Sequence, residues 1–100
     1  MKKSPLAPIK FPDMPPVKGV KMSTKEANIK YTNRADLLLV QMCDETVVAG
    51  CFTKSKTASA NIIFARDAIK KNKAKILIVN SGNANAFNGK SGEDSVDKIV

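Results

Sequence analysis

Three residues have the types and the spacing expected at the end of a phosphate-binding loop. Gly89, Lys90 and Ser91 reproduce the last three positions of the pattern Gly-x-x-x-x-Gly-Lys-Ser/Thr, and they lie between an apolar run and an expected helix. The pattern also requires a glycine five positions before Gly89, because the glycines let backbone N–H groups curl around one phosphate. That position holds Ala84. The spacing therefore favours a simple turn over a phosphate site.

Residues that could supply a nucleophile, a general base or metal ligands are few. The sequence has no histidine, so it can form neither a Ser–His nor a Cys–His pair. Cys43 and Cys51 lack the spacing of a zinc site, and we expect two buried thiols in a reducing compartment. The acidic pairs at 44–45 and 93–94 are typical of a solvated turn and of the first turn of a helix. These residues predict no metal, no cofactor and no reaction of their own.

The net charge of +8 raises the question of an acidic partner. Lysines dominate and are scattered, arginine occurs only at Arg34 and Arg66, and no aromatic residue is grouped with the lysines. Nucleic-acid readers favour arginine forks with interleaved aromatics, so a solvated lysine-rich surface is the preferred interpretation. No apolar run is long enough to span a membrane, and no apolar stretch follows Lys2 and Lys3 as in a signal peptide. We expect a cytoplasmic protein.

The first half of the chain predicts an arm followed by a hairpin. Five prolines make residues 1–18 an extended arm, and residues 19–100 are expected to be globular. Residues 29–31 could form a short strand. Residues 36–42 and 47–52 are apolar and of strand length, and the polar stretch between them predicts an antiparallel hairpin. Gly50 indicates a bulge or a close backbone approach.

The second half predicts a strand, a small-residue loop and a helix. Residues 61–64 suit a short strand and residues 65–73 a helix with lysines at its C-terminal end. Residues 75–79 are the clearest strand, expected to be buried on both faces. A loop rich in asparagine and glycine follows at 80–86, and a helix is expected to begin near residue 93. Residues 95–100 suggest a chain cut within that helix.

Several segments in a fixed order resemble one known family. They are Lys-Gly-Val at 18–20, Ala-Asp-Leu-Leu-Leu-Val at 35–40, Val-Ala-Gly-Cys-Phe-Thr at 48–53, Ala-x-Ala at 58–60 with Arg66 behind it, and Ile-Val-Asn-Ser-Gly-Asn-Ala-Asn-Ala at 78–86 with glycines at 89 and 92. Together they resemble the N-terminal part of the α chain of ornithine acetyltransferases, the bifunctional glutamate N-acetyltransferases. Residues 79–86 carry most of the resemblance.

The resemblance implies a fold and a reaction. The fold is a mixed-sheet α/β sandwich, of which these residues supply the N-terminal part. The precursor cleaves itself into α and β chains, and an α2β2 heterotetramer is expected. A threonine freed at the head of the β chain transfers acetyl from N-acetylornithine, or in some members acetyl-CoA, to glutamate, with its own α-amine as base. No position here matches a catalytic residue of the family, so these 100 residues alone are expected to be inactive.

The loop at 80–86 contains the residues that we expect to lie nearest the substrate pocket. The candidates are Asn80, Ser81, Asn83 and Asn85. Their side chains could bond to groups at the pocket, or they could hold the loop's own backbone, with Gly82 at a strained angle. We favour the second interpretation. The alternatives from other classes are a basic, non-enzymatic nucleic-acid-binding module and a nucleotide-binding α/β domain.

Overall fold

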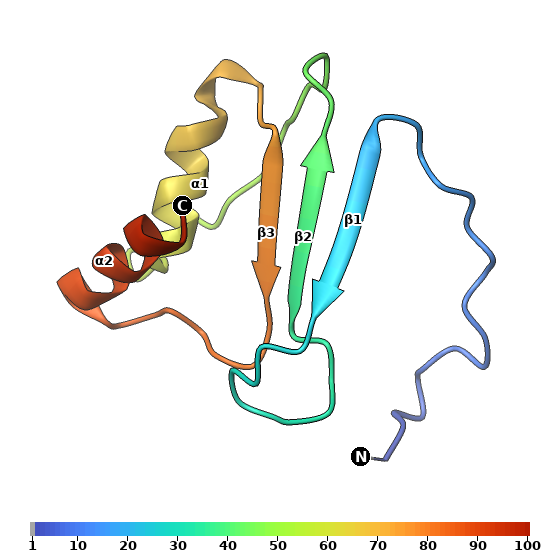
Figure 1. The fold of residues 1–100 in the computed structure, drawn as a ribbon. Helices are drawn as coiled ribbons and strands as arrows, with labels where there is room; N and C mark the ends of the chain where they lie inside the picture. Colours follow the sequence, from blue (N-terminus) through green and yellow to red (C-terminus); the bar gives the residue numbers. More distant parts are fainter. Residues whose placement is uncertain (1) are drawn as a thin grey trace.

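A computed structural model describes residues 2–100. Three strands and two α-helices follow the N-terminal arm, and a 3-10 turn extends the first helix (Figure 1). In chain order the elements are β1 (Val20–Lys25), β2 (Leu37–Met42), α1 (Ala60–Ala68), η1 (Ile69–Lys71), β3 (Ile76–Asn80) and α2 (Gly89–Ile99).

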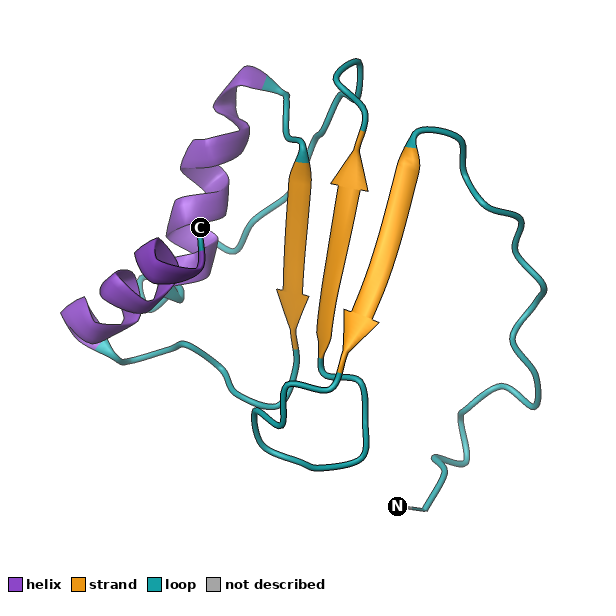
Figure 2. Ribbon diagram, in the orientation of Figure 1, coloured by secondary structure: helices purple, strands orange, loops and turns teal. Residues whose placement is uncertain are grey.

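The three strands form one antiparallel sheet in the order β1-β2-β3 (Figure 2). Residue Leu38 of the central strand faces Thr24 of β1 on one side and Val79 of β3 on the other. The apolar run of β2 was predicted as a strand, and that prediction is confirmed. Strand β1 was not predicted, because its sequence Val-Lys-Met-Ser-Thr-Lys has only weak alternation of apolar and polar residues.

The predicted hairpin between residues 36–42 and 47–52 is wrong. Both edges of β2 are occupied, by β1 and by β3, so no edge is left for residues 47–52. That segment makes a single bridge from Val47 to Lys73. Gly50 does mark a close approach, because an added Cβ would lie 3.2 Å from Cδ1 of Ile69. The predicted strand at 29–31 is also wrong, since those residues form bends between β1 and β2.

Both helices begin earlier than the sequence predicts. Helix α1 starts at Ala60, so the predicted strand at 61–64 is wrong. Its first turn forms because the N–H groups of Ile62 and Ile63 both donate to the carbonyl of Ser59. Helix α2 starts at Gly89, so the triplet at 89–91 forms the first helical turn instead of a free turn. The acidic pair at 93–94 therefore lies in the second turn.

Little of this molecule is buried. Strand β3 was predicted to be buried on both faces, but it lies at an edge of the sheet, and its apolar side chains are exposed, from 40% at Ile78 to 55% at Ile76. Cys43 and Cys51 are also exposed, contrary to prediction, because neither lies in a covered strand. Among residues 2–100, Val96 of α2 is the one apolar side chain classed as buried.

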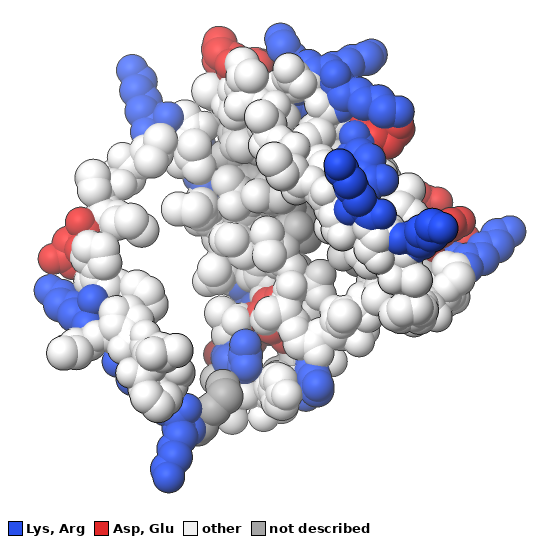
Figure 3. Space-filling view, turned by 180° about the vertical axis from the view of Figure 1, so that it is seen from behind, with Lys and Arg blue, Asp and Glu red and all other residues white. Residues whose placement is uncertain are grey.

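The arm and the helices lie on opposite sides of the sheet. The arm runs beside β1 and away from it, whereas α1 and α2 lie on the side of β3 (Figure 1). Seen from behind, lysines and arginines are spread over the surface with acidic residues among them (Figure 3). Within the described chain, no helix has the length and apolarity needed to cross a membrane.

Candidate functional site

The first half of the loop after β3 is held by the end of the sheet. Asn80 is the last residue of β3, and its Nδ2 donates to the carbonyl of Asn83 at 3.2 Å. The N–H of Ser81 donates to the carbonyl of Asp36 at 2.9 Å. Gly82 follows with φ +98°, an angle that L side chains rarely adopt. The strained glycine predicted at this position is therefore present.

The second half of the loop is held by amide side chains against α2. The Nδ2 of Asn85 donates to the carbonyl of Gly92 at 2.9 Å, and its Oδ1 accepts from Nδ2 of Asn88 at 2.8 Å. Gly92 permits this approach, since a Cβ there would lie 2.9 Å from Oδ1 of Asn85. Between these contacts Phe87 has φ +58° and a highly exposed side chain.

A buried carboxylate organises the neighbouring loop at the same end of the sheet. Asp36 is only 6% exposed, and its two oxygens accept from the N–H groups of Ala27 at 2.6 Å and Ile29 at 2.7 Å. These hydrogen bonds, Ile29 first and Ala27 second, hold the pKa of Asp36 below its usual value despite the opposing effect of burial. The two loops touch, because an added Cβ on Gly82 would meet Cβ of Lys30 at 3.1 Å.

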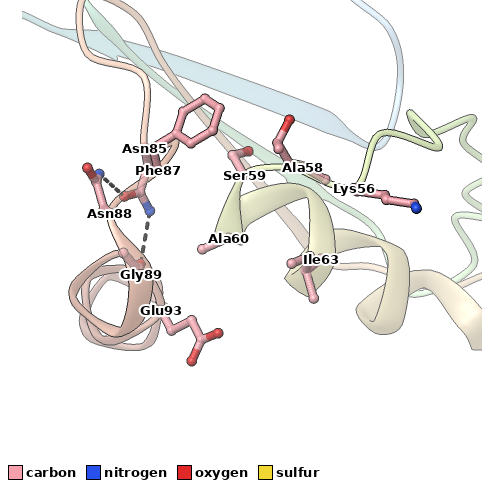
Figure 4. Close-up of a pocket in the computed structure, with 12 residues that line it drawn as sticks. Lys56, Ala58, Ser59, Ala60, Ile63, Asn85, Phe87, Asn88, Gly89 and Glu93 are labelled. Atoms are coloured by element: carbon pink, nitrogen blue, oxygen red, sulfur yellow. Dashed lines mark hydrogen bonds between the residues drawn. The ribbon is translucent and has the colours of Figure 1, made fainter.

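An open pocket of about 280 Å³ lies between residues 56–63 and residues 85–93. Asn85 and Asn88 lie on one side, and Ser59, Ala60 and Ile63 lie on the other (Figure 4). Of the four predicted site residues, Asn85 lines this pocket, whereas Asn80, Ser81 and Asn83 do not. The structure therefore splits the predicted set between the end of the sheet and the start of α2.

The described residues offer positioning groups but no reacting pair. The side-chain hydrogen bonds of these residues join polar side chains to the backbone or to one another. None of them links a hydroxyl or a thiol to a lysine or carboxylate that could take its proton. Lys56, Ser59 and Glu93 give the pocket polar groups of both charges. This arrangement can hold a neighbouring segment or a ligand, and it contains no activated nucleophile.

Sequence reasoning missed Asp36, a buried side chain that accepts two backbone hydrogen bonds. It was counted as the first residue of an apolar strand. An available signal was an ionisable residue placed directly before three consecutive leucines, where a charge must either be bonded or leave the strand. Its two N–H donors come from a loop whose path the sequence did not predict.

The model of the ArgJ family matches residues 21–100. The chain belongs to the ArgJ family. An arginine biosynthesis bifunctional protein ArgJ of Mesorhizobium japonicum is 55% identical over 92 residues, which is 92% of this chain and 22% of that protein. The ArgJ protein of Bartonella quintana is 42% identical over all 100 residues, 24% of its own length. The chain thus spans about a quarter or less of these ArgJ relatives.

Two solved structures share the fold. An ornithine acetyltransferase from Mycobacterium tuberculosis, crystallised with ornithine, has a TM-score of 0.72 and 28% identity, and the match covers 77% of this chain and 40% of that one. An ArgJ protein of Bacillus halodurans has a TM-score of 0.74 at 28% identity, covering 82% and 43%. The resemblance to ornithine acetyltransferases and the mixed α/β class are therefore confirmed.

Proposed function

We propose that this chain is the N-terminal part of an acetyltransferase of arginine biosynthesis that moves acetyl from N-acetylornithine to glutamate. The observation that supports the proposal most directly is 55% identity, over 92 residues, to a protein named as a bifunctional enzyme of arginine biosynthesis. The likeness to an ornithine acetyltransferase crystallised with ornithine supports the same substrate class.

In this proposal residues 1–100 supply scaffold and the reacting groups come from another segment. A threonine hydroxyl attacks the acetyl carbonyl of N-acetylornithine, its own α-amine takes the proton, and ornithine leaves as the acetyl ester forms. The amino group of glutamate then attacks the ester and restores the hydroxyl. A threonine–glycine pair later in the α chain would hold the oxyanion. Self-cleavage into α and β chains, an α2β2 assembly, a cytoplasmic location and independence from metal and cofactor belong to the same proposal.

The first experiment tests the division of labour. A protein of the relatives' length that begins with these residues is incubated with N-acetylornithine labelled in the acetyl group and with glutamate. We expect labelled N-acetylglutamate, and mass spectrometry should show two polypeptides from one precursor. Residues 1–100 alone should transfer no label. Transfer by residues 1–100, or an uncleaved and inactive long protein, would contradict the proposal. Replacing N-acetylornithine by labelled acetyl-CoA tests the second donor.

The second experiment tests whether Asn85, the one of the predicted residues Asn80, Ser81, Asn83 and Asn85 that lines the pocket, acts as a group at the substrate pocket. Asn85 is the informative position, because it lines the pocket and also bonds to Gly92 and Asn88. Asn85→Ala in the long protein should lower the melting temperature and leave kcat/KM nearly unchanged if its bonds serve the loop. A large loss of kcat/KM at unchanged melting temperature would instead place the side chain against substrate. Asn83→Ala serves as the matched control.

A further inference from the structure

Asp36, the residue before β2, is the one ionisable residue classed as buried among residues 2–100. Its carboxylate oxygens accept hydrogen bonds from the N–H groups of Ala27 at 2.6 Å and Ile29 at 2.7 Å. A buried charge is retained only where hydrogen bonds or an opposite charge offset its lost hydration. These bonds are internal to residues 27–36, so they do not depend on what covers the surface of a longer protein.

The backbone groups of Asp36 connect the same residue to two other segments. Its N–H donates to the carbonyl of Lys25 at 3.1 Å, and its carbonyl accepts from the N–H of Ser81 at 2.9 Å. The second bond continues the pairing of Leu37 with Asn80 beyond the end of β3. The loop that follows β3 is therefore attached to Asp36 at its start, at the end of the sheet where the β1–β2 loop also lies (Figure 1).

A steric contact joins the two loops a second time. Gly82 has φ +98°, and an added Cβ there would lie 3.1 Å from the Cβ of Lys30 and 3.6 Å from its backbone nitrogen. Lys30 directly follows Ile29, whose N–H group is bound by the carboxylate of Asp36. A shift of Ile29 would therefore move the chain into Gly82 or away from it. The contact uses the backbone and the Cβ of Lys30, so the lysine charge has no part in it.

The carboxylate of Asp36 acts as an acceptor for the backbone and not as a partner for a cation. Among the described residues, Asp36 takes part in no ion pair. Its bonds to Ile29 and Ala27 are the main reason that its pKa is lowered, and the charge of Arg34 contributes least. A carboxylate used in this way fixes the path of the chain, because two N–H groups must stay where its oxygens are.

We propose that Asp36 is a positioning residue, and that its carboxylate holds residues 80–86 in the path required for substrate binding in the long protein. This role rests on the function proposed above. Asn85, near the far end of the loop, lines the pocket that residues 56–63 complete. Residues 80–86 contain no group placed in the reaction, so a displaced loop should weaken binding and leave the chemical step nearly unchanged. Asn85→Ala leaves both attachments of the loop in place and does not test this role.

Steady-state kinetics of the long protein test the role in binding. Asp36→Asn offers one acceptor and one donor in place of two acceptors, so it keeps at most one of the two bonds. We expect the KM for N-acetylornithine to rise about tenfold, with kcat changed by less than about twofold. Asp44→Asn, beyond the other end of β2, is the control and should change neither constant.

Two kinetic outcomes would overturn the role in binding. A fall in kcat at unchanged KM would mean that Asp36 only raises the fraction of folded molecules. Unchanged kcat and KM in Asp36→Asn would mean that the loop does not position substrate.

Hydrogen exchange in the same long protein tests the positioning without any need for activity. In Asp36→Asn, peptides that span residues 26–31 and 80–86 should both exchange about tenfold faster, as measured by mass spectrometry. Asp44→Asn should leave both peptides unchanged. Faster exchange at residues 26–31 alone would overturn the coupling of the two loops. A wild-type long protein that transfers no acetyl would contradict the proposed function, and the exchange result would still decide whether Asp36 positions the loop.

A substitution on the other side of the contact covers the case in which Asp36→Asn does not fold. Gly82→Ala leaves the carboxylate in place and inserts a Cβ against Lys30. Because coupling between two sites is reciprocal, it should speed exchange at residues 26–31 about fivefold. Lys30→Ala keeps the Cβ and should leave exchange in both loops unchanged. If residues 26–31 stay equally protected in Gly82→Ala, the two loops are independent and the proposal fails.

Discussion

Two loops meet at one end of the sheet, and they are held by different chemistry. The loop between β1 and β2 is organised by a charged group, the buried carboxylate of Asp36, which accepts two backbone N–H groups. The loop between β3 and α2 is organised by neutral amides, chiefly Asn85 with its bonds to Gly92 and Asn88. The two are linked where Ser81 donates to the carbonyl of Asp36.

Because of this difference, the stability of the two loops should respond differently to pH and to substitution. Hydrogen bonds to an ionised group are stronger than neutral ones, and they weaken when that group loses its charge. The β1–β2 loop should therefore depend on one residue and on pH. The β3–α2 loop should depend on backbone fit and on several modest bonds, and it should be indifferent to pH. Substitutions in the two loops can be compared in one protein.

The largest expected effect is that of Asp36→Ala. It leaves the N–H groups of Ala27 and Ile29 without their acceptor, and burial makes such loss costly. We expect the melting temperature to fall by about 10 °C in thermal denaturation followed by circular dichroism. Asp44→Ala is the control, because Asp44 is exposed and only pairs with Lys75, and it should shift the melting temperature by no more than about 2 °C. Equal shifts of the melting temperature in the two variants would show that the buried carboxylate of Asp36 does not stabilise the fold more than an exposed one.

The pH dependence should carry the same signature. Because the folded-state pKa of Asp36 is depressed, its contribution to stability is present above the unfolded pKa of about 3.9 and is lost as pH falls through the folded value. The difference in melting temperature between the wild type and Asp36→Asn should therefore be full at pH 6 and should shrink as the pH falls below the unfolded pKa. A difference that stays constant over this range would show that the carboxylate charge is not what holds the loop.

A smaller effect is expected for Gly82→Ala in the amide-held loop. The new Cβ meets Lys30 at 3.1 Å, and φ +98° is strained for alanine, so the free energy of unfolding should fall by about 2 kcal/mol in urea denaturation. Gly89→Ala is the matched control. It also has a positive φ, +55°, but its Cβ would meet no atom within 4 Å, so about 1 kcal/mol is expected. If both substitutions lower the free energy of unfolding by the same amount, the contact between Gly82 and Lys30 does not contribute to stability.

The smallest effect should come from Asn85→Ala. It removes one neutral hydrogen bond to Gly92 and one from Asn88 at a partly exposed site, for a loss of about 1 kcal/mol in urea denaturation. The loss should be the same at pH 4 and pH 7, unlike that of Asp36→Asn. Asn83→Ala should be neutral, because only the backbone carbonyl of Asn83 has a recorded hydrogen bond. A decrease in the free energy of unfolding above about 3 kcal/mol would mean that Asn85 stabilises more of the structure than its own loop.

The sequence predicts those elements whose local pattern agrees with their packing. The leucines of β2 and the β-branched residues of β3 favour a strand by their local sequence alone. A glycine is expected at position 82 because the backbone after β3 has a positive φ there. The amide bonds of Asn80 and Asn85 to nearby backbone agree with the favoured interpretation of the loop, since asparagine readily bonds to groups a few residues away.

The features that sequence reasoning missed depend on contacts between distant segments. Strand β1 has weak alternation and becomes a strand because β2 offers it an edge, which takes that edge from residues 47–52. Residues 61–64 have strand-like composition, but they form part of helix α1, where Ile63 and Phe64 line an open pocket shared with α2. Asp36 is buried because a ten-residue loop folds back over it. None of these follows from a local pattern.

The exposed edge strand β3 has a consequence for biosynthesis. In a protein of the relatives' length, made from its N-terminus, β3 leaves the ribosome long before the last three quarters of the chain exist. During that interval the outer edge of a strand of isoleucine, leucine and valine is open to pairing with other nascent chains. Because charged side chains block edge-to-edge pairing, a lysine in place of Ile78 should raise the yield of soluble nascent chain.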